Sequence, residues 1–381
     1  TVAKAEYRQE LIKNQSARCM AAYAYASAGS DESTSDLVFG GHCMIAENGH
    51  MIAESREIGN CKKIIGTIDV QKLNFERQKS SFGDDDKRKF REINCSVVKA
   101  NIFDEVPSVV FDGTPFVPKD KSKLEARCKE IFEIQGAGLI RRLKQLSSTS
   151  KINIGISGGL DSTLALLVAV YACRKCGWDL KRIQGITMPG FGTTTKTYNN
   201  AVKLMNLLNI SSKEVDIKES CIQVFKDIGH KPFGLSLENI ENDLKALPND
   251  AQDLVFENVQ ARVRTLILMS HGFVLGTGDM SELALGWCTY NGDHMSMYNV
   301  NCSVPKTLVK FLVQYVANNL DVLNITCQEA ADVLGEIVNT IISPELLPAG
   351  KDGEIQQSTE EKLGAYELHD FFLSNFVKYG F

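Results

Sequence analysis

A loop rich in glycine and hydroxyl groups carries the clearest chemical signal in this chain. Between an apolar run at residues 152–156 and another at 164–172 lies the sequence Ser157-Gly158-Gly159-Leu160-Asp161-Ser162-Thr163. Adjacent glycines allow positive φ and close backbone approach, so main-chain amides can surround an anion. The hydroxyls add donors, and the start of the following helix adds partial positive charge. The loop therefore predicts a phosphate-binding site.

The aspartate within this loop indicates a metal ion. A carboxylate repels phosphate, so Asp161 beside a phosphate site is best explained by a bridging Mg²⁺. As a purely structural alternative, Asp161 and Ser162 would cap the helix and the glycines would form a turn. Capping does not account for two glycines, two hydroxyls and a strand–loop–helix context together. The loop is not a Walker A motif, because no Gly-Lys-Ser/Thr follows.

Alternating helix and strand patterns begin near residue 122. We expect helices over 124–146, 164–172, 197–208 and 256–269, and strands over 152–156, 182–188, 214–217 and 272–276. This alternation predicts an α/β fold with a doubly wound parallel sheet. Ligands of such sheets bind at the carboxyl ends of the strands, where the loop at 157–163 lies.

The first part of the chain has a different pattern. We expect a helix over 7–26 and strands over 37–39, 44–46, 51–53 and 64–68. Asn48-Gly49 between two apolar runs predicts a hairpin turn. A mixed charge run at 83–89 and three later prolines indicate a linker. The expected domains are thus residues 1–82 and 122–381, joined by a linker over 83–121.

Composition limits the classes of function. The 381 residues suggest two or three domains, and 42 basic against 47 acidic residues give a net charge of −5, which argues against nucleic-acid binding. No apolar run approaches the roughly 20 residues of a membrane span, and the start lacks a signal-peptide layout. Eleven scattered cysteines are typical of reduced thiols, so we expect a cytoplasmic protein. The one C-x-x-C, at 173–176, lacks the second ligand pair of a zinc site.

Several segments together resemble a known family. The loop at 157–163 resembles the signature of the ATP pyrophosphatase superfamily, whose members split ATP between its α and β phosphates. Three further segments, at 256–264, 275–282 and 285–293 with Tyr298-Asn299-Val300-Asn301 after them, resemble glutamine-dependent NAD synthetase in order and spacing. This resemblance covers residues 122–381 and implies the fold of that superfamily.

The resemblance also implies the site residues. The residues implied to bind ATP are Gly155, Ile156, Ser157, Gly158, Gly159, Leu160, Asp161, Ser162, Met188 and Thr277. Those implied to bind deamido-NAD⁺ are Asn258, Glu282, Trp287, Cys288, Thr289 and Tyr290. Asp161 and Glu282 are implied to be the catalytic carboxylates that share Mg²⁺. Core packing is the alternative for Trp287 and Tyr290, and Arg262 and Arg264 could bind phosphates or form surface ion pairs.

The implied reaction is the amidation of deamido-NAD⁺ to NAD⁺. ATP adenylates the nicotinate carboxylate, releasing pyrophosphate, and ammonia then displaces AMP from the NAD-adenylate. Glutamine supplies the ammonia in the complete enzyme, and the family assembles as homo-oligomers. Alternatives are a tRNA-modifying ATP pyrophosphatase, disfavoured by the acidic balance and the lone C-x-x-C, and a nonenzymatic ATP-binding module, disfavoured by Glu282.

The start of the chain resembles the later part of a nitrilase-like glutaminase domain. The Glu, Lys and Cys triad of such domains lies upstream of the matching segment, so we expect no glutaminase activity from this chain. We expect Cys19 and Cys43 to be buried small side chains instead. The initial residue is not Met, and the last residue, Phe381, precedes a C-terminal lysine of the family, so a partial chain is expected.

Overall fold

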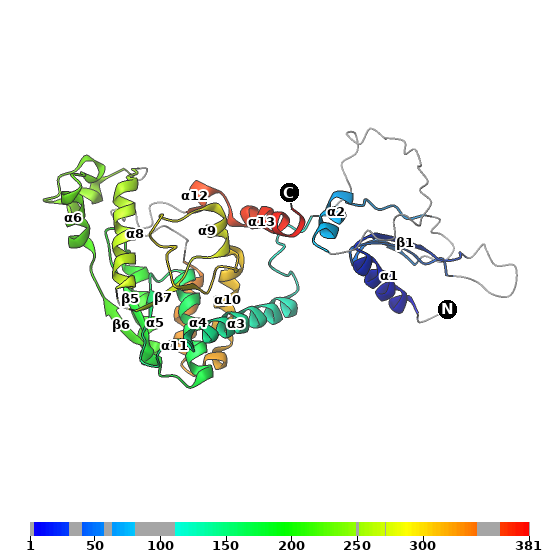
Figure 1. Cartoon of the computed structure of the whole chain (residues 1–381), viewed down its shortest axis with the longest axis horizontal. Coiled ribbons are helices and arrows are strands. Elements are labelled where there is room, and N and C mark those ends of the chain that lie inside the picture. The colour runs from blue at the N-terminus through cyan, green and yellow to red at the C-terminus, as the bar shows by residue number, and fades with distance from the viewer. Residues whose placement is uncertain are drawn as a thin grey trace. The chain divides into compact units, whose positions relative to one another are not determined.

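The described residues fall into two compact units. The computed structural model describes residues 4–29, 40–56, 63–80, 111–248, 251–270, 272–340 and 359–380. One unit comprises Thr1–Asp112 with Asn375–Phe381, and the other comprises Gly113–Ser374 (Figure 1). Among the described residues, no helix combines the length and apolar character that crossing a bilayer requires. The assignment of the units to a glutaminase and a synthetase stays a prediction.

The described residues before Asp112 form a small antiparallel sheet with two helices. Its elements are α1 (Ala5–Cys19), β1 (Ala22–Ala26), β2 (Cys43–Glu47), β3 (His50–Ser55) and α2 (Val70–Gln78). The strand order is β1-β2-β3. Asn48 and Gly49 have positive φ of 43° and 85°, which confirms the predicted hairpin turn. The predicted strands at 44–46 and 51–53 are confirmed as parts of β2 and β3.

The single helix expected over residues 7–26 is wrong beyond Cys19. Met20 adopts a left-handed conformation with φ 45°, and its amide donates to the Ala17 carbonyl, so the helix ends there. The next residues form β1, in which Ala22 pairs with Glu47 and Ala26 with Cys43. The alanines favour a helix locally, but pairing with the edge of the hairpin satisfies the backbone of this segment and prevails.

Three other expectations for this unit fail or fall outside the described residues. Residues 64–68 form no strand, and they lead instead into α2, which Asp69 caps by accepting from the Lys72 amide at 2.9 Å. Cys19 is exposed and Cys43 half-buried, so the expectation that both are buried is wrong. Cys19 ends α1, where its sulfur accepts from the Gln15 amide group at 3.2 Å, and Cys43 begins β2. The strand expected at 37–39 lies outside the described residues.

The second unit contains a five-stranded parallel sheet, which confirms the predicted parallel arrangement and adds one strand, β8, that the sequence did not predict. Its strands are β4 (Ile152–Gly155), β5 (Ile183–Thr187), β6 (Ser211–Glu214), β7 (Phe273–Gly276) and β8 (Tyr298–Asn299). They lie in the order β6-β5-β4-β7-β8, and every neighbouring pair is parallel. The chain moves outward from β4 through β5 to β6 and returns to the other side of β4 with β7. The direction therefore switches between β4 and β7, where α/β sheets bind ligands.

The second unit also contains long and short helices, and the last of them, α13, continues into residues assigned to the first unit. The long ones are α3 (Lys121–Leu143), α4 (Leu160–Cys176), α5 (Thr195–Leu207), α6 (Lys218–Asp227), α8 (Leu254–Met269), α10 (Lys306–Asn318), α11 (Gln328–Val338) and α13 (Tyr366–Tyr379). The short ones are α7 (Ile240–Asp243), α9 (Met280–Leu285) and α12 (Thr359–Leu363). The four helices expected from the sequence are confirmed with shifted ends. The strand expected at 214–217 is wrong, because β6 ends at Glu214.

Two hydrophobic cores lie on the two faces of the sheet. The larger contains Ile152 and Ile154 of β4 with residues of α3, α4, α5, α10 and α11. The smaller contains Ile186 of β5 with residues of α6 and α8. Helix α4 packs against both α3 and α10 and is buried along most of its length, which explains its nearly uniform apolar sequence.

The packing of α3 on α4 depends on one aromatic contact. Phe132 is fully buried and its ring centre lies 5.3 Å from that of Tyr171. Gly136 lies one turn further along α3, where a Cβ would come within 2.4 Å of the Tyr171 ring. By contrast, Ile134 is 63% exposed, although its spacing in the sequence suggests a core position.

We expect Phe132→Ala to lower the free energy of unfolding by about 3–5 kcal/mol, because it leaves a cavity beside Tyr171. Ile134→Ala, on the exposed side of α3, should change it by less than about 0.5 kcal/mol. Urea denaturation followed by tryptophan fluorescence measures both, since Trp178 and Trp287 are the only tryptophans and both belong to the second unit. Equal losses in the two variants would contradict this packing.

Candidate active site

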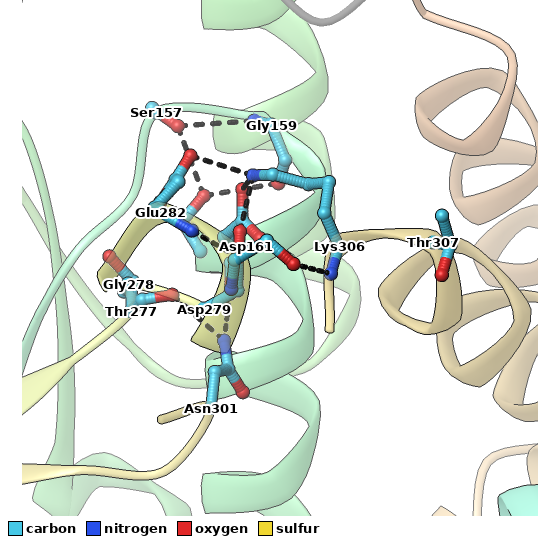
Figure 2. Close-up of polar contacts among 12 residues, drawn as sticks. Ser157, Gly159, Asp161, Thr277, Gly278, Asp279, Glu282, Asn301, Lys306 and Thr307 are labelled. Carbon is cyan, nitrogen blue, oxygen red and sulfur yellow. Dashed lines mark hydrogen bonds and ion pairs between the residues drawn. The ribbon is translucent and has the colours of Figure 1, made fainter. Parts of the chain in front are cut away.

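The loop between β4 and α4 has the geometry of an anion cradle. The Gly159 amide donates to the Ser157 hydroxyl at 3.1 Å, and the Ser157 and Ser162 hydroxyls lie 3.1 Å apart (Figure 2). Ser162 also donates to the Gly159 carbonyl at 3.2 Å. The loop is thus held in shape by its own hydroxyls. No side chain caps the start of α4 among the described residues, which leaves its first amides available to an anion.

Gly158 is the residue at which this loop requires glycine. Its φ is +89°, and a Cβ there would come within 2.2 Å of the Thr197 carbonyl oxygen on α5. Backbone atoms of α5 cannot yield as a flexible side chain could. The need for glycine at position 158 therefore has two causes, a left-handed backbone and the close approach of α5, whereas Gly159 has an ordinary φ of −85°.

Three carboxylates and one lysine form a cluster beside the loop. The Lys306 ammonium lies 2.7 Å from Asp161, 2.6 Å from Asp279 and 2.7 Å from Glu282 (Figure 2). Asp161 is in the first turn of α4, Asp279 and Glu282 are at the start of α9, and Lys306 begins α10. We call these four residues the carboxylate–lysine cluster.

The cluster is closed on one side and open on the other. The side chains of Asp279 and Lys306 are 0% and 2% exposed, whereas those of Asp161 and Glu282 are 23% and 24% exposed. Asp161 and Glu282 therefore present the accessible carboxylate oxygens. With three carboxylates against one ammonium, the fully ionised cluster is net negative and attracts cations.

Mutual repulsion and burial shift the pKa values of the cluster. Burial raises the pKa of Glu282, and the neighbouring Asp161 carboxylate raises it further. The pKa of Asp279 is also raised, chiefly by burial. Burial alone would lower the pKa of Lys306, but the three carboxylates outweigh it and hold the pKa well above its usual value. The lysine is thus a permanent cation here.

The residues present fit a divalent cation such as Mg²⁺. One oxygen each from Asp161, Asp279 and Glu282 lies within 4.8 Å of the others, and no other such group of metal-ligating side chains occurs among the described residues. The Oδ1 atom of Asp161 is buried and has no hydrogen-bond partner in the part of the chain that the structure describes. A carboxylate oxygen in that state is suited to a metal ion.

An asparagine ties the loops of this site together. The Asn301 amide group donates to the Asp161 carbonyl at 2.9 Å and to the Thr277 carbonyl at 3.0 Å. Its own side-chain oxygen accepts from Gln135 of α3 at 3.1 Å. Through this buried contact, the start of α4 and the end of β7 are held at a fixed separation, beside the switch point of the sheet.

Comparison with known proteins assigns the chain to a family. A sequence model described as NAD synthase matches residues 137–378. The chain belongs to the NAD synthase family. The glutamine-dependent NAD(+) synthetase of Mycobacterium tuberculosis (strain ATCC 25618 / H37Rv) is 39% identical over 394 residues, which cover 100% of this chain and 55% of the relative. That of Mycobacterium leprae (strain TN) is 40% identical over 397 residues, again covering 100% and 55%.

A more distant relative agrees. The glutamine-dependent NAD(+) synthetase of Acinetobacter baylyi (strain ATCC 33305 / BD413 / ADP1) is 29% identical over 323 residues, covering 76% of this chain and 53% of the relative. The chain thus spans about half the length of the curated relatives it matches.

The residues that the resemblance implies for ATP binding lie at the carboxyl ends of the strands. Gly155 ends β4, residues 156–159 form the loop, and Leu160, Asp161 and Ser162 open α4. Thr277 follows β7 directly. Met188 follows β5, and its carbonyl accepts from Arg264 at 3.2 Å. The structure therefore brings the residues that follow β4 and the residue that follows β7 together at the switch point of the sheet. Their roles in binding ATP remain predictions.

The residues implied to bind deamido-NAD⁺ are more dispersed. Asn258 lies on α8, and the segment from Trp287 to Tyr290 follows α9. Arg262 of α8 donates to the Tyr290 carbonyl at 3.1 Å, which links the two parts. The Tyr290 ring is 74% exposed and stacks on His294 at 6.0 Å, so core packing does not explain this tyrosine.

The sequence analysis missed Lys306, Asp279 and Asn301. Asp279 caps α9 by accepting from the Ser281 and Glu282 amides at 2.8 and 3.0 Å, a pattern visible in Asp279-Met280-Ser281-Glu282. Lys306 offered a signal too, because a lysine in the first turn opposes the helix dipole. Asn301 lies in the segment Tyr298-Asn299-Val300-Asn301 that carries the resemblance, but its residue type alone indicated no role.

We expect Gly158→Ala to disrupt the loop and to abolish measurable binding of Mg²⁺–ATP, because the new methyl group meets the Thr197 carbonyl. Gly177→Ala is the matched control. Gly177 also has positive φ, +65°, but a Cβ there meets nothing within 4 Å. That variant should lose about 1 kcal/mol of stability and keep ATP binding. Equilibrium dialysis with labelled ATP compares them, and equal affinity would contradict the close-approach argument.

Proposed function

We propose that this chain carries the synthetase site of a glutamine-dependent NAD synthetase. In this site, ATP adenylates the nicotinate carboxylate of deamido-NAD⁺, and ammonia converts the adenylate to NAD⁺. The observation that carries the proposal is the carboxylate–lysine cluster beside a preformed anion cradle, within a chain of the NAD synthase family. In the longer protein, glutamine hydrolysis supplies the ammonia.

The chemistry explains why such a site needs charge rather than a protein nucleophile. A carboxylate does not form an amide directly, because oxide is a poor leaving group. Attack of the nicotinate oxygen on the α-phosphorus of ATP forms a mixed anhydride and expels pyrophosphate. Ammonia then attacks the acyl carbon and expels AMP. Both steps depend on orientation and on stabilising charge on phosphate oxygens.

The residues divide this work according to their contacts. The amides at the start of α4 bind phosphate oxygens, while the Gly159 amide holds the loop in shape through the Ser157 hydroxyl. Lys306 supplies a fixed positive charge, and Asp161 and Glu282 are the exposed ligands for Mg²⁺, which neutralises the polyphosphate when bound. Asp279 keeps Lys306 and the start of α9 in place.

In this proposal, the adenine of ATP and the deamido-NAD⁺ dinucleotide bind to segments that flank the carboxylate–lysine cluster. The segment after Met188 borders the adenine, and Arg264 and Gln260 hold it through the Met188 carbonyl and the Phe191 amide. Asn258 and the segment from Trp287 to Tyr290 meet deamido-NAD⁺, and this segment offers the half-buried Trp287 and the exposed Tyr290 as aromatic partners for its rings. A cytoplasmic, homo-oligomeric enzyme stays a prediction of the sequence.

Asp161→Asn and Glu282→Gln should each lower pyrophosphate release at least about 100-fold, because each removes a charge that holds Mg²⁺ and keeps the shape of the side chain. Glu329→Gln is the control, since Glu329 is an exposed partner of Lys203 on the surface. It should leave the rate within about twofold. Near wild-type release by either cluster variant at saturating Mg²⁺ would exclude a shared metal ion.

Deamido-NAD⁺ should raise the melting temperature of the chain in the presence of Mg²⁺ and ATP. A ligand at a hundredfold excess over its dissociation constant stabilises the folded state by about 2.7 kcal/mol. Nicotinamide mononucleotide, xanthosine monophosphate, aspartate and transfer RNA are the comparison ligands and should give no shift. A shift with transfer RNA alone would favour a tRNA-modifying enzyme, and a shift with ATP but no pyrophosphate release with any acid would favour a binding module.

A further inference from the structure

Asp370 of α13 is a buried carboxylate that joins two other helices. It is 2% exposed. Its Oδ2 atom accepts from the amide and the hydroxyl of Thr307, at 3.0 and 2.6 Å, and its Oδ1 atom accepts from the Ser281 hydroxyl. Ser281 belongs to α9 and Thr307 to α10. One side chain thus fixes the starts of both helices.

Both partners of Asp370 adjoin the carboxylate–lysine cluster. Ser281 directly precedes Glu282, and Thr307 directly follows Lys306. In addition, the Lys306 amide donates to the Ser281 hydroxyl at 2.9 Å. The Ser281 hydroxyl therefore accepts from the backbone of Lys306 and donates to Asp370. The position of Lys306 relative to Glu282 depends on this hydroxyl.

A second residue of α13 supports the same lysine. Tyr366 lies one turn before Asp370 and is 2% exposed. The Lys306 ammonium lies 5.5 Å from the centre of its ring, within the range of a cation–π contact. Helix α13 thus reaches Lys306 in two ways, at its backbone through Asp370 and the intervening Ser281 hydroxyl, and at its charged end through the Tyr366 ring.

Helix capping alone does not explain these bonds. If Asp370 only capped α10, its hydrogen bonds with Thr307 would be enough. Helix α9 already has its cap, because Asp279 accepts from the Ser281 and Glu282 amides. The bond from Ser281 to Asp370 is therefore additional, and it acts on the one hydroxyl that contacts the backbone of Lys306.

We propose that Asp370 is a positioning residue that, through Ser281, sets Lys306 and Glu282 against the phosphate loop. This inference rests on the proposed function, since it assumes that the cluster serves Mg²⁺–ATP. Asp370 is too deeply buried to touch a substrate and acts through its neighbours. A displacement of about 1 Å in such groups can lower a rate on the order of 100-fold.

The test uses Ser281→Ala, Asp370→Asn and the double variant, with ammonia as nitrogen donor. Asp120→Asn is the matched control, because Asp120 accepts from the Ser122 and Lys123 amides at the start of α3, outside the cluster. Ser281→Ala and Asp370→Asn should each raise the KM for ATP at least about tenfold and lower kcat. A loss of stability alone would lower kcat through the folded fraction and leave KM unchanged.

The double variant isolates the shared bond. Because Ser281→Ala and Asp370→Asn disrupt the same interaction, the KM of the double variant should lie within about twofold of the weaker-binding single variant. The proposal would be overturned if the increases in KM multiply in the double variant, or if the single variants have the same KM as Asp120→Asn. If Asp370→Asn does not fold, Ser281→Ala decides alone, since it keeps both bonds between Asp370 and Thr307. A wild-type KM in that variant would overturn the proposal.

Failure of the proposed function gives a different result. In that case the wild-type chain releases no pyrophosphate with deamido-NAD⁺, and binding of Mg²⁺–ATP by equilibrium dialysis replaces the rate measurement. At least tenfold weaker binding by Ser281→Ala and Asp370→Asn, with unchanged binding by Asp120→Asn, supports the positioning role. Unchanged binding by all three variants overturns it.

Discussion

The contact of one ammonium with three carboxylates is the constraint on which this site depends. Lys306 joins the starts of α4, α9 and α10 through Asp161, Asp279 and Glu282. Without the lysine, three carboxylates would be packed together with no positive partner, which costs several kcal/mol per buried charge. The cluster therefore fixes the relative positions of these helices, while the Oδ1 atom of Asp161 keeps no hydrogen-bond partner among the described residues.

The sequence predicts those parts of the site whose chemistry is local. The strand, the loop and the helix around Gly158 are recognisable because φ, hydroxyl donors and the helix start act within a few consecutive residues. Asp161 lies within that loop, whereas Glu282 is implied only by the resemblance to the family. The role of the loop residues in binding ATP and the functions of the two units stay predictions. Lys306 and Asp370 could not be placed, because their partners lie on other helices, Ser281 being separated from Asp370 by 89 positions.

The errors in the first unit have the same physical origin. Ala22–Ala26 has the composition of a helix, yet it forms β1 because the neighbouring hairpin offers hydrogen bonds to its whole length. The apolar residues at 64–68 have the composition of a strand, but they pair with no strand and lead into α2. In both segments, the availability of a partner outweighs local propensity, and a single sequence does not reveal that partner.

The order of strands has a consequence for how the chain reaches its native state. The central strand β4 pairs with β7, where Ile152 lies opposite Phe273, so a long stretch of chain must be enclosed before this pair forms. Closing such a loop is entropically unfavourable, and sheets built from distant segments fold slowly. The proposed nucleotide site spans this seam of the sheet. In a chain that has paired β4, β5 and β6 but not yet β7, the loop at 157–163 lacks the residues that follow β7, so nucleotide binding at the proposed site would report that the sheet is complete.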